Sequence, residues 1–310
     1  MDLMLTSTIL WFVGAFFVAM LLLACLLWAK MNYYIVSISN ELRAQSAEAA
    51  AHIPPMAYTT QIVNPVTNGI YQRDIAYNLA CTCYATSHAV ESGLTSIDHP
   101  IGYPNYTPII SINPIDNTNT TYGYIFWNDT SVIFSFSGTS SKSEWTSDFQ
   151  YTLVPAVKLN GYEPGVLCHQ GFYDIYVSFQ NVLWDWLNTH LYITNIFITG
   201  ISLGGALSNL CAYDFAKSRP HIIHYSFASP QSGNPTFAKQ FNSRLPTSLR
   251  VYNTSDVIPD LPPSVISGYV YSHVGQNVPF TYSGPSLAYN HIATYAEYLP
   301  HCPQFTDCHQ

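Results

Sequence analysis

Charged side chains are scarce in this chain. Its 310 residues include 10 Lys and Arg and 18 Asp and Glu, so only 9% are charged and the formal net charge is -8. Soluble domains carry about 25% charged residues. Nucleic-acid binding requires clustered Lys and Arg that neutralise phosphates, and the few that are present exclude that class. A solvated disordered chain is excluded as well, because 48% of the residues are hydrophobic.

The chain also lacks the motifs that indicate metal or nucleotide chemistry. It contains no His-Glu-x-x-His, no paired Cys-x-x-Cys and no glycine-rich phosphate-binding loop. We therefore expect neither a metal ion nor a cofactor. Aromatic residues are abundant instead, with 24 Tyr, 16 Phe and 6 Trp. Together with β-branched runs, they favour a compact domain that contains a sheet.

One long run near the N-terminus has no formal charge and extends from Leu3 to Ala29. As a helix it would be about 40 Å long, more than the roughly 30 Å of a bilayer's hydrocarbon core. It also exceeds the roughly 7–15 apolar residues of a signal peptide. We predict a single-pass transmembrane anchor over residues 1–30. A cleaved signal peptide is the alternative, with small residues for cleavage at Ser46-Ala47-Glu48-Ala49.

The rest of the chain divides into a stalk and a body. Residues 31–55 are rich in helix formers and end at Pro54-Pro55, which predicts a helical stalk that stops there. Residues 56–310 have the length of one α/β domain. Apolar runs that predict strands begin at Val132, Asn195, His224 and Leu249, and helical patterns cover 171–190 and 205–218. This alternation predicts a largely parallel sheet covered on both faces.

The sequence contains conflicting signals for the side of the membrane on which the body lies. Lys30 and Arg43 follow the apolar run, and the positive-inside rule would keep the body in the cytoplasm. An even number of body cysteines permits disulfides, and Asn-x-Ser/Thr triplets would be glycosylation sites in a lumenal protein. These cysteines are Cys81, Cys83, Cys168, Cys211, Cys302 and Cys308, and the triplets begin at Asn105, Asn119, Asn128 and Asn253. We favour an extracytoplasmic body.

A candidate nucleophile stands at the end of the second predicted strand. Gly200-Ile201-Ser202-Leu203-Gly204 fits Gly-x-Ser-x-Gly, in which a serine occupies a strained turn between a strand and a helix. Only small residues fit beside such a turn. Because an apolar run precedes the motif and small residues follow it, we predict Ser202 as a nucleophile rather than an incidental serine.

A serine nucleophile needs a histidine base, and the histidine needs a carboxylate that fixes its tautomer. In this arrangement the acid follows the serine in the chain and the histidine comes last. Asp256 directly follows a predicted strand, at the sheet edge where ligands bind, and is the predicted acid; Asp260 is the alternative. His291, ahead of a final helix, is the predicted base, whereas His273 is predicted to be a packed histidine.

Together these segments resemble the class 3 (fungal-type) lipases, a family that includes feruloyl esterases. The resemblance rests on residues 200–207, 225–235, 253–263 and 289–291 and covers roughly 74–299. It implies an α/β-hydrolase that cleaves acyl esters with Ser202, Asp256 and His291 as its triad. The interval between the acid and the base is short for the family, which implies a trimmed loop.

The resemblance also implies an oxyanion hole. The backbone N–H of Leu203, directly after the nucleophile, would be one donor. Residues 136–139, Phe-Ser-Gly-Thr, resemble the family's Phe-Arg-Gly-Ser/Thr motif and would place the second donor at Thr139. Ser137 stands where the family has Arg. Asp148 matches the position that orients the hydroxyl of Thr139 in relatives.

Two further segments match the family. Residues 168–172 resemble its Val-His-x-Gly-Phe segment, which makes His169 a supporting histidine. Residues 140–147 occupy its lid position, with Trp145 as the one large apolar side chain beside Lys142 and Glu144. Lids that open onto oil surfaces need an apolar face, so this polar lid favours an esterase, whereas the anchor favours a lipid substrate.

We therefore expect a serine carboxylic-ester hydrolase of the lipase type that acts on acylglycerols or phospholipids through an acyl-enzyme, without a cofactor or an inferable protein partner. A feruloyl or carbohydrate-type esterase is the alternative enzyme. An inactive membrane-anchored binding module is the alternative from another class. Cys302 and Cys308 are expected to pair with each other, or with Cys81 or Cys83, since relatives have a bridge between the first helix and the C-terminus.

Overall fold

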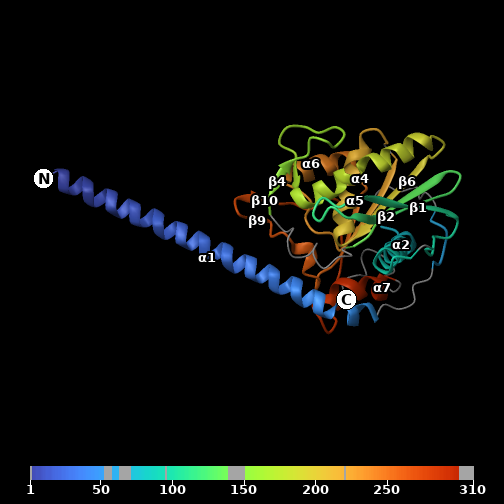
Figure 1. The fold of residues 1–310 in the computed structure, drawn as a ribbon, viewed down its shortest axis with the longest axis horizontal. Helices are drawn as coiled ribbons and strands as arrows, with labels where there is room; N and C mark the ends of the chain where they lie inside the picture. The colour runs from blue at the N-terminus through green and yellow to red at the C-terminus, as the bar shows by residue number, and fades with distance from the viewer. Residues whose placement is uncertain are drawn as a thin grey trace.

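The computed structural model describes residues 2–51, 58–62, 71–94, 96–138, 151–219 and 221–299. Its body is built on a seven-stranded sheet with helices on both faces (Figure 1). In spatial order the strands are β1 (Asn105–Ile112), β2 (Asn119–Trp127), β3 (Ser131–Phe136), β6 (Asn195–Ile201), β7 (Ile222–Phe227), β8 (Leu249–Asn253) and β11 (Gln276–Phe280).

Strands β3, β6, β7, β8 and β11 run parallel to one another, and β2 and then β1 continue the sheet as antiparallel strands. The prediction of a largely parallel sheet is therefore confirmed. Every residue of β3 and of β7 is buried, as expected for parallel strands with both faces covered. Two small antiparallel pairs accompany the sheet: β4 (Leu153–Pro155) with β5 (Leu167–His169), and β9 (Val265–Ile266) with β10 (Tyr269–Val270).

The helices are α1 (Asp2–Ala51), α2 (Arg73–Ser92), α4 (Gln170–Thr189), α5 (Leu203–Ala216), α6 (Pro235–Arg244) and α7 (Thr294–Tyr298), with a 3-10 turn η1 (Ile258–Asp260) and a π-helical turn η2 (Tyr289–Ala293). Successive side chains of β6 point to opposite faces of the sheet. Ile196 and Ile198 pack in the core with α4, α5 and α6, whereas Phe197 packs in the core with α2 and α7.

Helix α1 is one continuous helix of 50 residues that projects from the body (Figure 1). It includes the predicted anchor from Asp2 onward and residues 31–51 of the predicted stalk, and it ends at Ala51, shortly before the two prolines. Within it, Phe16–Ser46 is long and apolar enough to cross a membrane, with a mean hydropathy of 1.7 and no buried residue in its apolar window. A signal sequence has the same properties.

The cysteines of the described residues form no disulfide. Cys25, Cys81, Cys83, Cys168 and Cys211 are all free thiols, so the predicted bridge from Cys81 or Cys83 to the C-terminus is wrong. The physical reason is clearest at Cys83, whose Sγ lies 3.3 Å from the hydroxyl of Thr199 in the core. Burial raises the pKa of this thiol to about 12, which removes the thiolate that oxidation requires. Cys302 and Cys308 lie outside the described residues.

Candidate active site

Ser202 occupies a strained turn between β6 and α5. Its backbone has φ 58° and ψ -125°, a conformation that residues with a side chain rarely adopt. Glycines make the turn sterically possible: a Cβ on Gly200 would lie 2.1 Å from the carbonyl oxygen of Gly204, and a Cβ on Gly204 would lie 2.2 Å from that of Phe136. The N–H of Ser202 donates to the carbonyl of Phe227 on β7 over 3.0 Å. The serine is thus presented at the carboxyl edge of the sheet.

The structure brings Ser202, His291 and Asp256 together in one chain of hydrogen bonds. His291 Nε2 lies 2.8 Å from Ser202 Oγ, and His291 Nδ1 lies 2.9 Å from Asp256 Oδ2. Only 6%, 4% and 3% of the surfaces of Ser202, His291 and Asp256 are exposed. Asp260, the alternative acid, lies on η1 with an exposed side chain. This arrangement allows the imidazole to take a proton from the serine while the carboxylate holds its other nitrogen.

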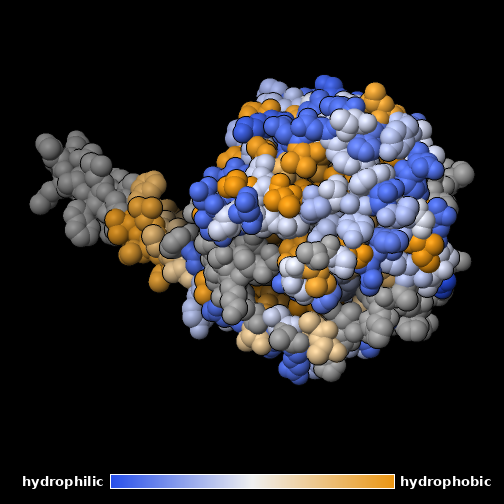
Figure 2. Space-filling model, turned by 45° about the vertical axis from the view of Figure 1, so that its right-hand side comes forward, coloured by the Kyte–Doolittle hydropathy of each residue, from blue (hydrophilic) through white to orange (hydrophobic). Residues whose placement is uncertain are grey.

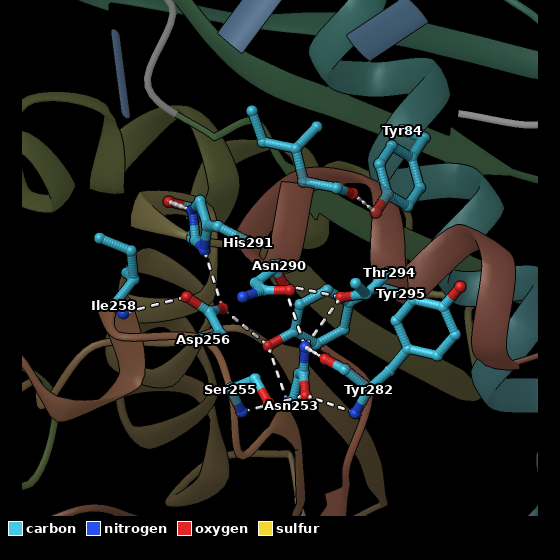
Figure 3. A network of polar contacts seen from close by, with 12 residues as sticks. Tyr84, Asn253, Ser255, Asp256, Ile258, Tyr282, Asn290, His291, Thr294 and Tyr295 are labelled. Carbon is cyan, nitrogen blue, oxygen red and sulfur yellow. Dashed lines mark hydrogen bonds and ion pairs between the residues drawn. The ribbon is translucent and has the colours of Figure 1, made fainter. Parts of the chain in front are cut away.

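Two further donors fix the carboxylate of Asp256 (Figure 3). The N–H of Ile258 donates to Oδ1 over 3.0 Å, and the phenol of Tyr295 donates to Oδ2 over 2.9 Å. Burial and the adjacent Asp256 charge hold the pKa of Tyr295 well above its ordinary value, so the phenol stays a donor. Sequence reasoning missed Tyr295. Its position four residues after His291, on the same face of the predicted helix, was the available signal.

Asn253 joins the end of β8 to the histidine segment. Its Nδ2 donates to the carbonyl of Tyr282 over 2.8 Å and to the hydroxyl of Thr294 over 3.2 Å, while its own N–H donates to the phenol of Tyr295 over 3.1 Å (Figure 3). The expectation of a surface glycosylation site at Asn253 is therefore wrong, because the side chain is completely buried and its amide is used. Among the other triplets, Asn105 and Asn119 are exposed and Asn128 is partly exposed.

His291 sits in the π-helical turn η2, a wide turn of the kind that recurs at functional sites. The phenol of Tyr84, on α2, donates to the carbonyl of Ile292 (Figure 3). Asn290 accepts a hydrogen bond from the N–H of Gly284 over 2.6 Å. The histidine backbone is therefore held both by α2 and by the preceding loop.

Two predicted features of an oxyanion hole, the N–H of Leu203 and the loop after β3, lie beside Ser202. Leu203 is the first residue of α5, where a backbone N–H has no acceptor within its own helix. The loop after β3 passes close by, since a Cβ on Gly138 would lie 3.7 Å from Ser202 Cβ. Gly138 donates its N–H to Ser87 Oγ over 3.1 Å, and Ser137 donates its hydroxyl to the Gly138 carbonyl over 2.8 Å. Thr139, Trp145 and Asp148 lie outside the described residues.

His169 and His273 lie outside the hydrogen-bond chain of Ser202 and are packed in the body. His169 precedes α4, accepts the N–H of Phe172 at Nδ1 over 3.4 Å and stacks on that ring at 4.1 Å between centroids. Arg250 donates to His273 Nε2 over 3.4 Å. Burial lowers the pKa of His169 to about 3, and burial together with the Arg250 charge lowers the pKa of His273 to about 3. Both rings are therefore neutral at physiological pH.

Comparison with known proteins agrees with this geometry. Residues 133–266 match the family model Lipase (class 3). A chloroplastic phospholipase A(1), DAD1, of Arabidopsis thaliana is 31% identical over 153 residues, which cover 44% of this chain and 34% of that protein. A lipase of Rhizomucor miehei is 31% identical over 170 residues, which cover 51% of this chain and 44% of the lipase. The chain thus spans less than half the length of these relatives.

Solved structures give the same fold. A triacylglycerol lipase whose catalytic centre is a serine protease triad superposes with a TM-score of 0.50 at 25% identity, covering 67% of this chain and 79% of that one. The Rhizomucor miehei lipase propeptide complex superposes with a TM-score of 0.52 at 22% identity, covering 84% of this chain and 93% of that one. The prediction of an α/β-hydrolase fold is confirmed.

Proposed function

We propose that this chain is a serine hydrolase of the class 3 lipase family that cleaves ester bonds of acylglycerols or phospholipids. The observation that carries the proposal is the continuous hydrogen-bond chain from Ser202 through His291 to Asp256. Relatives named as a lipase and as a phospholipase A(1) support this class of substrate.

The reaction begins when Ser202 Oγ attacks the ester carbonyl carbon. His291 Nε2 takes the hydroxyl proton, and Asp256 accepts the hydrogen bond from Nδ1 and stabilises the imidazolium. The tetrahedral oxyanion receives a hydrogen bond from the N–H of Leu203 and, by the family resemblance, from Thr139. His291 then protonates the leaving alcohol or lysolipid, which departs and leaves the acyl group on Ser202.

The second half of the reaction releases the fatty acid. A water molecule gives its proton to His291 and attacks the acyl carbon, and the collapse of the second tetrahedral intermediate returns the proton to Ser202. We assign Asp148 to the orientation of the Thr139 hydroxyl, Trp145 to the lid, and His169 to the support of the strand and helix beneath the site. The side chain of His169 caps the N-terminus of α4, and this contact supports the role assigned to His169.

We further propose that α1 anchors the body to a membrane as a single span, with the body on the extracytoplasmic side. The exposed apolar residues of the helix support the span, among them Phe16, Leu21 and Leu26. Surface positions for Asn105 and Asn119 support the extracytoplasmic side. A protease-protection assay on microsomes, with glycosidase treatment, tests the side, since a cytoplasmic body would be digested and unglycosylated. Extraction of the microsomes with alkaline carbonate tests the span, since a body released by cleavage of a signal peptide would leave the membrane fraction.

The enzymatic proposal is tested with a fluorophosphonate probe and with esters of different chain length. We expect the probe to label Ser202 and hydrolysis of p-nitrophenyl esters, phosphatidylcholine and triacylglycerol to disappear in Ser202→Ala. Undiminished hydrolysis in that variant would overturn the assignment. A wild-type chain that neither labels nor hydrolyses any ester would instead be the inactive binding module.

A further inference from the structure

The C-terminal half of α1 is docked on the body along one stripe. Ile35, Ile38, Leu42 and Ala49 are all buried. Their separations of three, four and seven residues place them on one side of a helix. Tyr33, on another side, is 77% exposed. The helix therefore presents a defined apolar stripe to the body and its remaining surface to the surroundings.

This stripe packs on the two segments that carry the acid and the base of the triad. Its hydrophobic cluster includes Ile258 and Leu261, which follow Asp256, and Ala288 and Ile292, which flank His291. The N–H of Ala288 also donates to the side chain of Gln45 on α1 over 3.5 Å. Because the N–H of Ile258 itself holds Asp256 Oδ1, the helix rests on residues that position the triad.

The same helix continues without interruption into its apolar part. No Gly or Pro lies between Lys30 and Ala49, so nothing in the sequence introduces a hinge. From Ala29 to Ile35 the helix rises about 9 Å, and from Ala29 to Ala49 about 30 Å. The docked stripe thus begins within about two turns of the predicted end of the span. A membrane crossed by α1 lies at a set distance from the triad.

A second feature faces the same direction. The β9–β10 hairpin packs against the same cluster through Ile266. Val265 and Val270, which pair with each other across the hairpin, are 71% and 46% exposed. In Figure 1 this hairpin lies at the left edge of the body, the side toward which the N-terminal half of α1 extends. Figure 2 shows the apolar residues of α1 in orange where the helix leaves the body. Exposed apolar side chains beside a span, with Tyr33 and Tyr34 just after it, suit a lipid–water interface.

We propose that α1 holds the triad at a fixed height above the membrane that α1 itself crosses, with the β9–β10 hairpin against its surface, so that the substrate is an ester lipid of that same membrane. This inference rests on the proposed function and on the proposed span. It narrows the substrate from lipids in general to phospholipids and acylglycerols in the bilayer that contains the enzyme.

The experiment compares two locations of one substrate. The full chain is reconstituted in phosphatidylcholine vesicles, and a fluorogenic phospholipid is placed either in those vesicles or in added vesicles without protein. Rates are divided by the amount of enzyme that a membrane-impermeable fluorophosphonate labels from outside. We expect hydrolysis in the enzyme's own vesicles to exceed that in added vesicles by about tenfold or more at equal total lipid, because tethering raises the effective substrate concentration. Equal normalised rates would overturn the inference.

Two variants test the rigid support and the hairpin separately. We expect a flexible Gly/Ser insertion of about ten residues between Lys30 and Met31 to lower the rate on the enzyme's own vesicles about threefold or more, because it uncouples span and body. Val265→Asp should lower the same rate by a similar factor, because it places a charge against the lipid surface. Hydrolysis of a soluble short-chain ester should stay unchanged in both. Unchanged rates on the enzyme's own vesicles in both variants would contradict the inference.

Matched controls exist in the chain. The same Gly/Ser insertion between Asp116 and Asn117 lengthens the exposed β1–β2 turn, which lies at the end of the sheet opposite β8 and β11. Leu191→Asp places a charge at a side chain that is exposed just before β6, at the sheet edge opposite Ser202. Neither control should change any rate. Failure of the proposed function is distinguishable, because it would abolish probe labelling and soluble-ester hydrolysis irrespective of where the phospholipid is placed.

Discussion

Tyr295 donates the hydrogen of its phenol to Oδ2 of Asp256, the same carboxylate oxygen that His291 Nδ1 contacts. Oδ2 therefore accepts hydrogen bonds from Tyr295 and His291 at 2.9 Å each, and Oδ1 accepts one from the N–H of Ile258. A buried carboxylate held by three donors has one orientation available to it. In the proposed hydrolase, Tyr295 would therefore be a positioning residue that acts through Asp256 and does not touch the substrate.

The first prediction concerns Tyr295→Phe, which removes this donor and keeps the ring. Without the phenol, the carboxylate of Asp256 keeps only two donors and is no longer held in one orientation. We expect kcat for a soluble ester to fall about tenfold with little change in KM, because the alignment of His291 is lost and substrate binding is not. Tyr298→Phe, on the same helix, is the control and should leave kcat unchanged. A loss of thermal stability without a loss of kcat would mean that Tyr295 is only structural.

The second prediction concerns His224, which is buried between α5 and β8. Its Nε2 lies 3.0 Å from the hydroxyl of Ser208 and its Nδ1 2.7 Å from that of Ser248. Burial lowers its pKa from 6.5 to about 3, so the unfolded chain binds a proton between these values that the folded chain does not. Stability that is present above about pH 6.5 is therefore lost as the pH falls toward 3, by up to about 1.4 kcal/mol per pH unit.

His224→Gln, which cannot take up that proton, should flatten this dependence by about one proton's contribution. Urea unfolding of the detergent-solubilised chain at several pH values between about 7.5 and about 5 measures the slope in both proteins. His221→Gln, at an exposed position, is the control and should leave the slope unchanged. An identical slope in wild type and His224→Gln would show that His224 is not the group responsible.

The strained turn at Ser202 and the fold can be predicted from the sequence because both depend on local patterns. The strained turn at Ser202 is a short-range feature, and its glycines are required by contacts such as that between Gly204 and the Phe136 carbonyl. Buried parallel strands leave apolar runs that can be recognised one at a time. The choice between Asp256 and Asp260 was harder, because both lie in the same loop and only the structure brings one of them to His291.

Other features depend on contacts between distant segments. Asn253 matches a glycosylation triplet, yet its side chain is enclosed by residues that lie some thirty to forty positions later, which no local pattern indicates. The sequence predicts residues 31–55 only as a stalk, because the burial of the stripe on α1 depends on the cluster around Ile258 and Ala288. The pairing of Tyr295 with Asp256 likewise requires the end of β8 to meet η2 and α7.

The third prediction concerns the docked stripe. Ile38→Ala removes a buried side chain from the cluster shared by α1, η1 and η2, and should cost about 2–4 kcal/mol of unfolding free energy. Val36→Ala, two residues away at an exposed position, should change it by about 0.5 kcal/mol or less. Denaturant unfolding in detergent measures both variants. Equal effects would mean that the helix is not docked in solution.

The last prediction separates the two candidate acids. In Asp256→Asn the amide nitrogen replaces one carboxylate oxygen and must face either the N–H of Ile258 or the phenol of Tyr295. When it takes the place of the oxygen that contacts His291, its N–H donates to Nδ1, which must then accept a hydrogen bond. The ring proton then resides on Nε2, which can no longer take the proton of Ser202. We expect kcat for a soluble ester to fall about 10³–10⁴-fold with little change in KM. Asp260→Asn alters an exposed carboxylate and should keep the rate within about twofold. A larger loss in Asp260→Asn than in Asp256→Asn would make Asp260 the acid, because the side chain that fixes the histidine tautomer must be the one whose amide abolishes turnover.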